Sequence, residues 1–427
     1  MTAEVAVYNK SAVALAADSA STISGGRMHK IYNNAEKLFA LTKFHPVGIM
    51  VFGAGDFIDT PWELIIKTYR KNLGEKSFPT LGDYVQDFIS YIPCFIEKLP
   101  WSHTRYLKET IMGYYEYVES KIEAGSSFEE DADSLISVFL DEAKDLTDEK
   151  SVYLEFFSSA DVTPTQKLLR PIIDELMTLI GFNELPRGQK SKFRSSFLKF
   201  ATYALLKEHN FDSATSGLVF AGYGEDQYLP EIYTFEIKGM HLGKLRSVLI
   251  EDKCAEQGEA GIVPFAQQSE VESFMQGVTD HHVNHFFHLA TQHITREALI
   301  KFIEILDELD DIDDKTREKA TDKMFASLVK NQNTLKKELL DDIRENHVDK
   351  IVSMIEHLPK NELSYMAESL VNLTAFKRKV SYETDTVGGP IDVAVISKGD
   401  GFVWIKRKHY YPSELNQEHH LQHKYGE

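Results

Sequence analysis

Short apolar runs, separated by turn-forming residues, open the chain and return in its second half. They predict β-strands on both sides of the turn Asn9-Lys10-Ser11, and then over 37–41 and 47–52. Further runs of this kind predict strands over 217–224, 231–239, 244–252, 261–267, 391–397 and 402–408.

Helical periodicity dominates the two long segments between these strands, from about residue 75 to 212 and from about 268 to 379. Before the first segment, Thr60-Pro61-Trp62-Glu63 predicts a helix start capped by Thr60, and Gly74 predicts the end of that helix. Segregated strands and helices indicate an α+β fold with antiparallel sheet between helices. Both helical segments are too long for simple layer helices, so we expect much of each to be an insertion.

Charge and composition narrow the classes of partner. The 427 residues carry 47 basic and 66 acidic side chains, for a net charge of −19, which repels nucleic acid and anionic membrane surfaces. No apolar run approaches the roughly 20 residues that span a bilayer, and MTAEVAVYNK lacks the features of an export signal. Two cysteines, Cys94 and Cys254, are too few for a disulfide framework, so we expect a cytoplasmic protein.

Candidate chemistry lies at the start of the chain, in Thr2, Asp18 and Lys37. Removal of Met1, which a small following residue permits, would make Thr2 the first residue. Its hydroxyl would then be a nucleophile and its α-amine, a group with an ordinary pKa of about 7.7–8.0, the base. A lysine beside the hydroxyl favours the alkoxide, and an aspartate orients the lysine. Because Met-Thr starts and surface Asp and Lys residues are common, residue types alone do not decide the function.

The surrounding sequence resembles proteasome β-subunits and the related bacterial proteolytic ring subunit. TAEVAVYNKSAVALAADSAST aligns without gaps with the mature N-terminus of that family, and after a short glycine-rich loop AEKLFAL resembles its lysine-bearing strand. GIMVFGAGD resembles the glycine-rich turn that supplies oxyanion N–H groups. GLVFAGYG with EIYTFEIKG resembles the central strand pair, and TVGGPIDVAVISKGDGFVWI resembles the closing strand pair.

The resemblance implies an N-terminal-nucleophile hydrolase with a four-layer αββα sandwich and two helical insertions. The family core would comprise 2–74, 213–280 and 363–408, with insertions at 75–212 and 281–362 and a polar tail at 409–427. The resemblance assigns Thr2 as nucleophile, Lys37 and Asp18 as its partners, and the Phe52-Gly53 turn as the oxyanion site. By the same resemblance Ser21, Met50 and Ala54 would line an apolar substrate pocket, with Asp385 and Thr386 in support.

Departures from the family pattern keep two alternatives open. Val263-Pro264-Phe265-Ala266-Gln267 stands where the family has Gly-Ser-Gly, Val387 replaces a serine, and Phe52 stands where glycine is usual. The primary hypothesis is that the protein is a threonine peptidase, an enzyme that cleaves peptide bonds. One alternative is a catalytically silent scaffold or ring subunit, and the other is an amidase that acts on small molecules.

The resemblance also implies partners and cofactors. A polypeptide substrate and a homo-oligomer are expected, with a closed ring as one form, and no metal or organic cofactor is implied. The chain has no phosphate-binding glycine loop, so any ATP dependence would come from a separate ATPase. His281, His285 and His288 recur at helical spacing, but without a nearby cysteine or an H-E-x-x-H order they read as a polar helix face.

Overall fold

A computed structural model shows an α+β protein with 54% helix and 21% strand, and its sheets are antiparallel. The structure describes residues 3–25, 28–99, 103–122, 128–148, 150–212, 215–255, 259–309, 313–381, 387–409 and 411. Within these residues no helix combines the length and the hydropathy needed to cross a membrane.

One five-stranded sheet has the order β12-β1-β2-β13-β14, with every neighbouring pair antiparallel. Its strands are β1 (Ala3–Asn9), β2 (Ala12–Ala17), β12 (Gly261–Ala266), β13 (Asp392–Ser397) and β14 (Gly401–Lys406). Asn9 accepts a hydrogen bond from the Ser11 amide at 2.9 Å and so closes the predicted turn between β1 and β2. Strand β1 thus lies inside the sheet and not on its edge.

The second five-stranded sheet has the order β11-β10-β9-β6-β5. Its strands are β5 (Leu38–Ala40), β6 (Val47–Gly53), β9 (Ser216–Gly222), β10 (Glu231–His241) and β11 (Lys244–Cys254). All four ladders are antiparallel, and the strands predicted from short apolar runs occupy both sheets.

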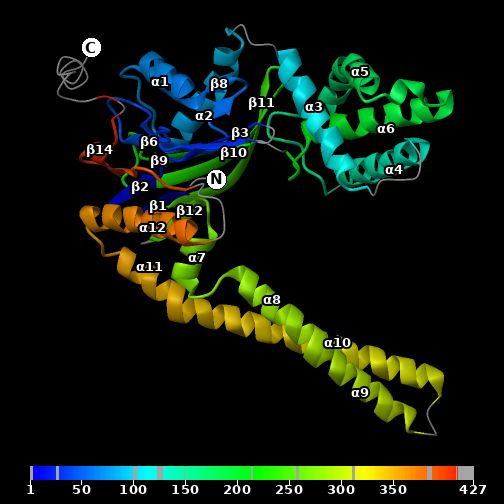
Figure 1. Cartoon of the computed structure of the whole chain (residues 1–427). Helices are drawn as coiled ribbons and strands as arrows, with labels where there is room; N and C mark the ends of the chain where they lie inside the picture. Colours follow the sequence, from blue (N-terminus) through cyan, green and yellow to red (C-terminus); the bar gives the residue numbers. More distant parts are fainter. Residues whose placement is uncertain are drawn as a thin grey trace.

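The two sheets pack face to face, and helices cover their outer faces (Figure 1). Side chains from both sheets, such as Leu15, Met50 and Val219, form the core between them. Helices α1 (Trp62–Leu73) and α2 (Leu81–Ile96) pack on the second sheet. Helix α12 (Lys360–Val380) packs on the first sheet. We refer to these sheets and helices as the body.

The start of α1 differs from the prediction. Thr60 does not cap the helix, because Thr60–Pro61 forms the short strand β8, paired with β7 (Asp56–Phe57). The Thr60 hydroxyl donates instead to the carbonyl oxygen of Ile58 at 3.2 Å. Gly74 ends α1 as predicted, with a φ of 58° that favours glycine.

Helices α3 to α6 form a separate unit beside the second sheet (Figure 1). They are α3 (His103–Glu119), α4 (Phe128–Thr147), α5 (Val162–Leu179) and α6 (Arg187–Leu206). Fully buried Arg246 of β11 joins this unit to the sheet, since it donates to the Tyr114 hydroxyl at 2.9 Å and to the Leu205 carbonyl at 3.0 Å. Although α2 lies within the predicted insertion 75–212, it belongs to the body by its packing, and the separate unit begins at α3.

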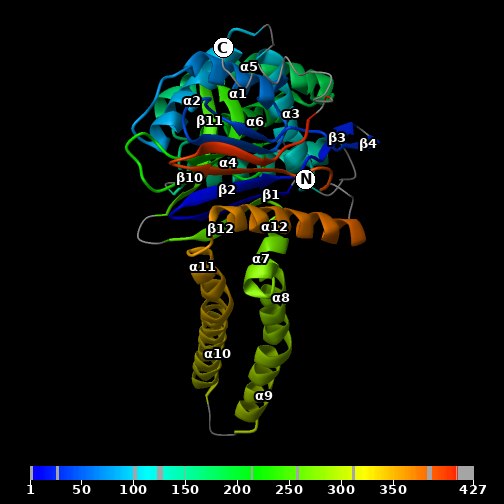
Figure 2. The same cartoon turned by 90° about the vertical axis from the view of Figure 1, so that its left-hand side faces the viewer.

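A long helical hairpin projects from the body on the side of α12 (Figures 1 and 2). Helix α7 (Ser269–Gln276) leads into it. The hairpin comprises α8 (Asp280–Ala290), a π-helical turn η4 (Thr291–Thr295), α9 (Arg296–Asp307), α10 (Asp314–Ile343), a second π-helical turn η5 (Arg344–Val348) and α11 (Asp349–Ile355). We call residues 280–355 the arm. At its base, the Asn9 side-chain amide donates to the carbonyl oxygens of Ile355 and Leu358, both at 2.9 Å.

Candidate active site

Asp18 and Lys37 meet between the two sheets, as the sequence predicted. Asp18 follows β2 of the first sheet, whereas Lys37 precedes β5 of the second. The Lys37 ammonium nitrogen lies 2.5 Å from Asp18 Oδ1, and the residues are 6% and 0% exposed. A pair this well shielded from water interacts strongly. Removing either residue would be costly, because the other charge would remain buried without a partner of opposite sign.

The Asp18 carboxylate also fixes the backbone around it. Oδ1 accepts from the Ala3 amide at 3.2 Å, and Oδ2 accepts from the amides of Ala20 at 3.3 Å and Gly388 at 2.8 Å. With the Lys37 ammonium, both carboxylate oxygens are saturated by donors from four different segments. Asp18 therefore holds together the start of β1, the end of β2 and the segment before β13.

Three of the predicted site residues, Thr2, Asp385 and Thr386, lie outside the described residues. Thr2 is directly followed in the sequence by a described residue. Its neighbour Ala3 is the residue whose amide binds Asp18. Asp18 thus binds the backbone of the residue that directly follows the proposed nucleophile in the sequence.

Glu4 is a member of this cluster that the sequence analysis missed. Its Oε1 lies 3.4 Å from the Lys37 ammonium nitrogen, and the residue is 1% exposed. In β1 it stands opposite Ala17 on one side and Phe265 on the other. The sequence held a signal, because Glu4 is the only charged residue of an otherwise buried strand. Two carboxylates therefore flank one buried ammonium group.

The turn after β6 has the backbone conformation that glycine favours. Gly53 has a φ of +77°, and a Cβ atom there would lie 2.5 Å from the Thr215 carbonyl oxygen. The next amide, of Ala54, donates to that same carbonyl at 3.0 Å, so it is already occupied. Trp62 and Ser216 stabilise the turn through two hydrogen bonds, each 2.9 Å long. The Trp62 indole N–H donates to the Ser216 hydroxyl, and that hydroxyl donates to the Ala54 carbonyl oxygen.

Two phenyl rings fill the space beside the cluster. Phe52 packs directly on Gly217, where an added Cβ would come within 2.0 Å of the ring. It also stacks on Phe265, with ring centroids 5.8 Å apart. Because Phe265 stands opposite Glu4 in the sheet, the rings adjoin the charged cluster.

The predicted substrate pocket is only partly accessible. Met50 is fully buried in the core between the sheets and pairs with Leu38, so its side chain is not a wall of an open cleft. Ser21, at the start of β3 (Ser21–Gly25), and Ala54 are half-buried. The prediction of an apolar cleft overlooked that a residue inside a strand between two sheets faces the core.

Val387 lies in the closing segment before β13, and Ser19, which follows β2, contacts that segment. Val387, which stands where the family pattern has a serine, packs in the core between the first sheet and α12. The Ser19 hydroxyl donates to the Pro390 carbonyl, and the Ser19 amide donates to the Gly388 carbonyl at 3.1 Å. A neighbouring serine therefore tethers this segment, while Val387 contributes apolar packing.

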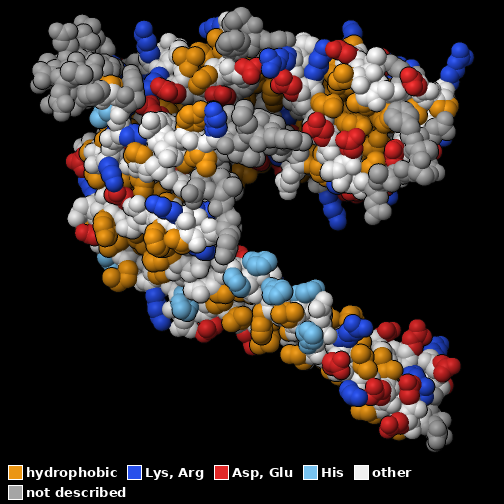
Figure 3. Space-filling view, in the orientation of Figure 1, with side chains coloured by type: hydrophobic (Ala, Val, Ile, Leu, Met, Phe, Trp, Pro, Cys, Tyr) orange, Lys and Arg blue, Asp and Glu red, His pale blue; other side chains and the backbone are white. Residues whose placement is uncertain are grey.

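The histidine-rich segment forms an exposed face of α8, as predicted. The rings of His281 and His285 stack with centroids 6.2 Å apart. Histidine side chains are visible along the side of the arm that borders the hollow between arm and body (Figure 3). In the part of the chain that the structure describes, no group of three or more His, Cys, Asp or Glu residues is arranged to hold a metal ion.

No protein-family model matches the chain, and none of the curated proteins matches it either.

Proposed function

We propose that this protein is a threonine-type N-terminal-nucleophile hydrolase that cleaves peptide bonds. The observation that carries the proposal is the Asp18 carboxylate, which binds the Lys37 ammonium and the Ala3 amide with the same oxygen. This contact brings the cluster to the residue after Thr2. The packing of helices, sheet, sheet and helix supports the αββα sandwich that we propose for the fold.

In the proposed reaction Thr2 Oγ attacks the carbonyl carbon of the amide bond, and the hydroxyl proton passes to the α-amine. The tetrahedral intermediate collapses, the amine product leaves with that proton, and an ester to Thr2 remains. Water then hydrolyses the ester, which releases the acid and restores the hydroxyl. Lys37 stabilises the developing negative charge on Oγ, Asp18 and Glu4 hold Lys37 in place, and the Gly53 turn borders the oxyanion.

The proposal includes a polypeptide substrate, a homo-oligomeric assembly and a cytoplasmic location, and it requires no metal or organic cofactor. It also requires a free α-amine on Thr2, so that everything before Thr2 must be removed. An amide nitrogen in that place could not accept the hydroxyl proton.

A second candidate is a catalytically silent subunit, which the phenyl rings of Phe52 and Phe265 favour. They occupy space next to the cluster that an incoming peptide would need. An amidase for small molecules is the third candidate, since a small substrate needs less of that space. Labelling with a probe distinguishes an active enzyme from a catalytically silent subunit. A panel of peptide and small amide substrates then distinguishes a peptidase from an amidase.

The test is labelling with a threonine-directed epoxyketone, followed by intact-protein and peptide mass spectrometry. The expected result is a single adduct on Thr2, in protein that has lost Met1. Thr2→Val, which removes the hydroxyl but keeps the shape, should abolish labelling, and Thr2→Ser should retain it. A silent subunit would give no adduct. An adduct elsewhere, or peptide hydrolysis by protein that keeps Met1, would refute the assignment.

A further inference from the structure

The arm buries little of its own apolar surface. Among the described residues, the α3–α6 unit has a core of twenty-four buried apolar side chains, whereas the arm's own cluster contains Val283, Phe287 and Ile343. Of the 30 residues of α10, only Ile343 is buried. Helices in water depend mostly on packing of an apolar face, so a long pair with so small a core is incomplete by itself.

A second apolar stripe runs along α8 and α9. It comprises five residues that are 38–68% exposed: Phe286, Leu289, Ile294, Ile305 and Leu309. Its intervals of three and eleven residues are close to whole helical turns, and the five-residue step from Leu289 to Ile294 crosses the π-helical turn η4. Leu309 follows the end of α9 at Asp307. In α8 the stripe lies on average about a third of a turn from Val283 and Phe287, which pack toward α10.

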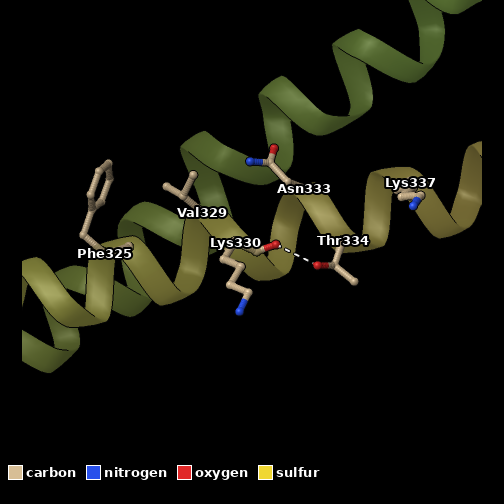
Figure 4. Close-up of a pocket in the computed structure, with 7 residues that line it drawn as sticks. Phe325, Val329, Lys330, Asn333, Thr334 and Lys337 are labelled. Atoms are coloured by element: carbon tan, nitrogen blue, oxygen red, sulfur yellow. Dashed lines mark hydrogen bonds between the residues drawn. The ribbon is translucent and has the colours of Figure 1, made fainter.

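Helix α10 carries a matching stripe beside a shallow groove. Phe325 and Val329 project from the same side of the helix, and Asn333 and Lys337 continue the lining of the groove (Figure 4). Leu340, eleven residues after Val329, extends the apolar side by three turns. Phe325 is 51% and Leu340 is 39% exposed. Both sides of the hairpin, α8 with α9 and α10, thus present exposed apolar residues in addition to those that join α10 to α8.

The charges of the arm are separated in a self-complementary way. Residues 304–314, at its far end, contain no basic residue, and their described carboxylates are Glu304, Asp307, Glu308, Asp313 and Asp314. The middle of α10, residues 323–337, contains four lysines and no acidic residue. Two arms placed antiparallel would bring each acidic end to the other's lysine segment.

We propose that the arm is a dimerisation element, and that its partner is the arm of a second copy of this chain. The two hairpins lie antiparallel in a four-helix bundle, with Phe325 near the two-fold axis. Eight stripe residues, each exposing roughly 80 Å², would bury on the order of 600 Å² per copy before their polar neighbours are counted, close to the roughly 800 Å² of a stable interface. An isologous contact of this kind closes on itself, as two-fold dimers do.

Sedimentation of the full chain at micromolar concentration tests the proposal. Ile305→Glu with Phe325→Glu should halve the mass of the wild-type particle, because charges in both stripes oppose burial. Leu179→Glu is the matched control, since this leucine of α5 is 75% exposed outside the arm, and it should leave the mass unchanged. Circular dichroism verifies folding of each variant. A monomeric wild type, or an unchanged mass in the double variant, would overturn the proposal.

Two further variants test the antiparallel register. Phe325→Cys should form a disulfide between two chains under mild oxidation, whereas Leu179→Cys, which has the same native cysteines, should not. Lys330→Glu with Lys337→Glu should weaken association, and adding Glu304→Lys with Glu308→Lys should restore it. Absence of the crosslink, or no restoration, would overturn the register and with it the proposal. A monomeric wild type would also remove the homo-oligomer from the proposed function, whereas the epoxyketone reports the proposed hydrolysis separately.

Discussion

Replacing Asp18 with asparagine removes one negative charge from the buried cluster and leaves the side-chain volume almost unchanged. The carboxylate accepts from Lys37 and Ala3 with one oxygen and from Ala20 and Gly388 with the other. An asparagine has one accepting oxygen, so its NH₂ group must face donors on one of the two sides. Asp18→Asn therefore leaves at least one pair of buried donors without an acceptor.

The size of the effect depends on Glu4. With Asp18 neutralised, Lys37 still has the Glu4 carboxylate at 3.4 Å, so its charge is not stranded. We expect Asp18→Asn to cost about 2–3 kcal/mol of unfolding free energy, from the lost charge-assisted hydrogen bond and the unsatisfied donors. In a Glu4→Gln background the ammonium loses both carboxylates, and the same change should cost about 3–5 kcal/mol.

Urea unfolding followed by tryptophan fluorescence measures this difference, because Trp62 and Trp404 both lie in the body. Four proteins form the cycle: wild type, the two single variants and the double variant. The expected coupling between the two sites is on the order of 1–2 kcal/mol, which is typical of residues that share a partner. Additive effects, or a cost of Asp18→Asn below about 1 kcal/mol in both backgrounds, would refute the reasoning.

The remaining predictions concern the turn, the phenyl rings and pH. Gly53→Ala should lower stability by about 1–3 kcal/mol, because its φ of +77° and the nearby Thr215 carbonyl oppose a side chain, whereas Gly55→Ala has open space and should stay within about 0.5 kcal/mol of wild type in urea unfolding. Phe52→Ala should cost about 1–3 kcal/mol and speed epoxyketone labelling; slower labelling would show that the ring supports the site. Burial lowers the pKa of His209 from 6.5 to about 4, so between these values the unfolded chain binds a proton that the folded chain does not. Stability should therefore fall as the pH drops from 6.5 toward 4, and His209→Gln should flatten this dependence of the urea midpoint.

Sequence periodicity predicted the sheets well, because strands buried on both faces leave unmistakable apolar runs. The run of small residues in β2, AVALAA, is fully buried between β1 and β13. The hairpin of β3 with β4 (Met28–Tyr32) was missed, since its residues are polar and glycine-rich and read as a loop. Thr60 was wrongly predicted to cap α1, because the sequence Thr-Pro-Trp-Glu is compatible both with a helix cap and with a short strand before the helix.

The Asp18–Lys37 pair was predicted only through the resemblance, since nothing local to either residue indicates contact across two sheets. Glu4 could have been predicted as a member, because a lone carboxylate in a buried strand needs a cation within reach. The path of the arm could not have been predicted. Helical periodicity indicates which residues face a neighbouring element, but it does not identify that element. Met50 and Phe52 show the same limit: they lie two positions apart in β6 and face the same way, and only the packing between the sheets decides that Met50 is fully buried and Phe52 partly exposed.

The hydrogen bonds of Asn9 give the arm a mechanical connection to the site. Asn9 ends β1 at the base of the arm, and Ala3 begins the same strand beside Asp18, so the two lie about 20 Å apart on one extended segment. Since β12 and β2 are bonded along both edges of β1, the strand resists bending and transmits a displacement along its length. A displacement at the base of the arm would therefore act on the same strand whose first residue, Ala3, donates to Asp18.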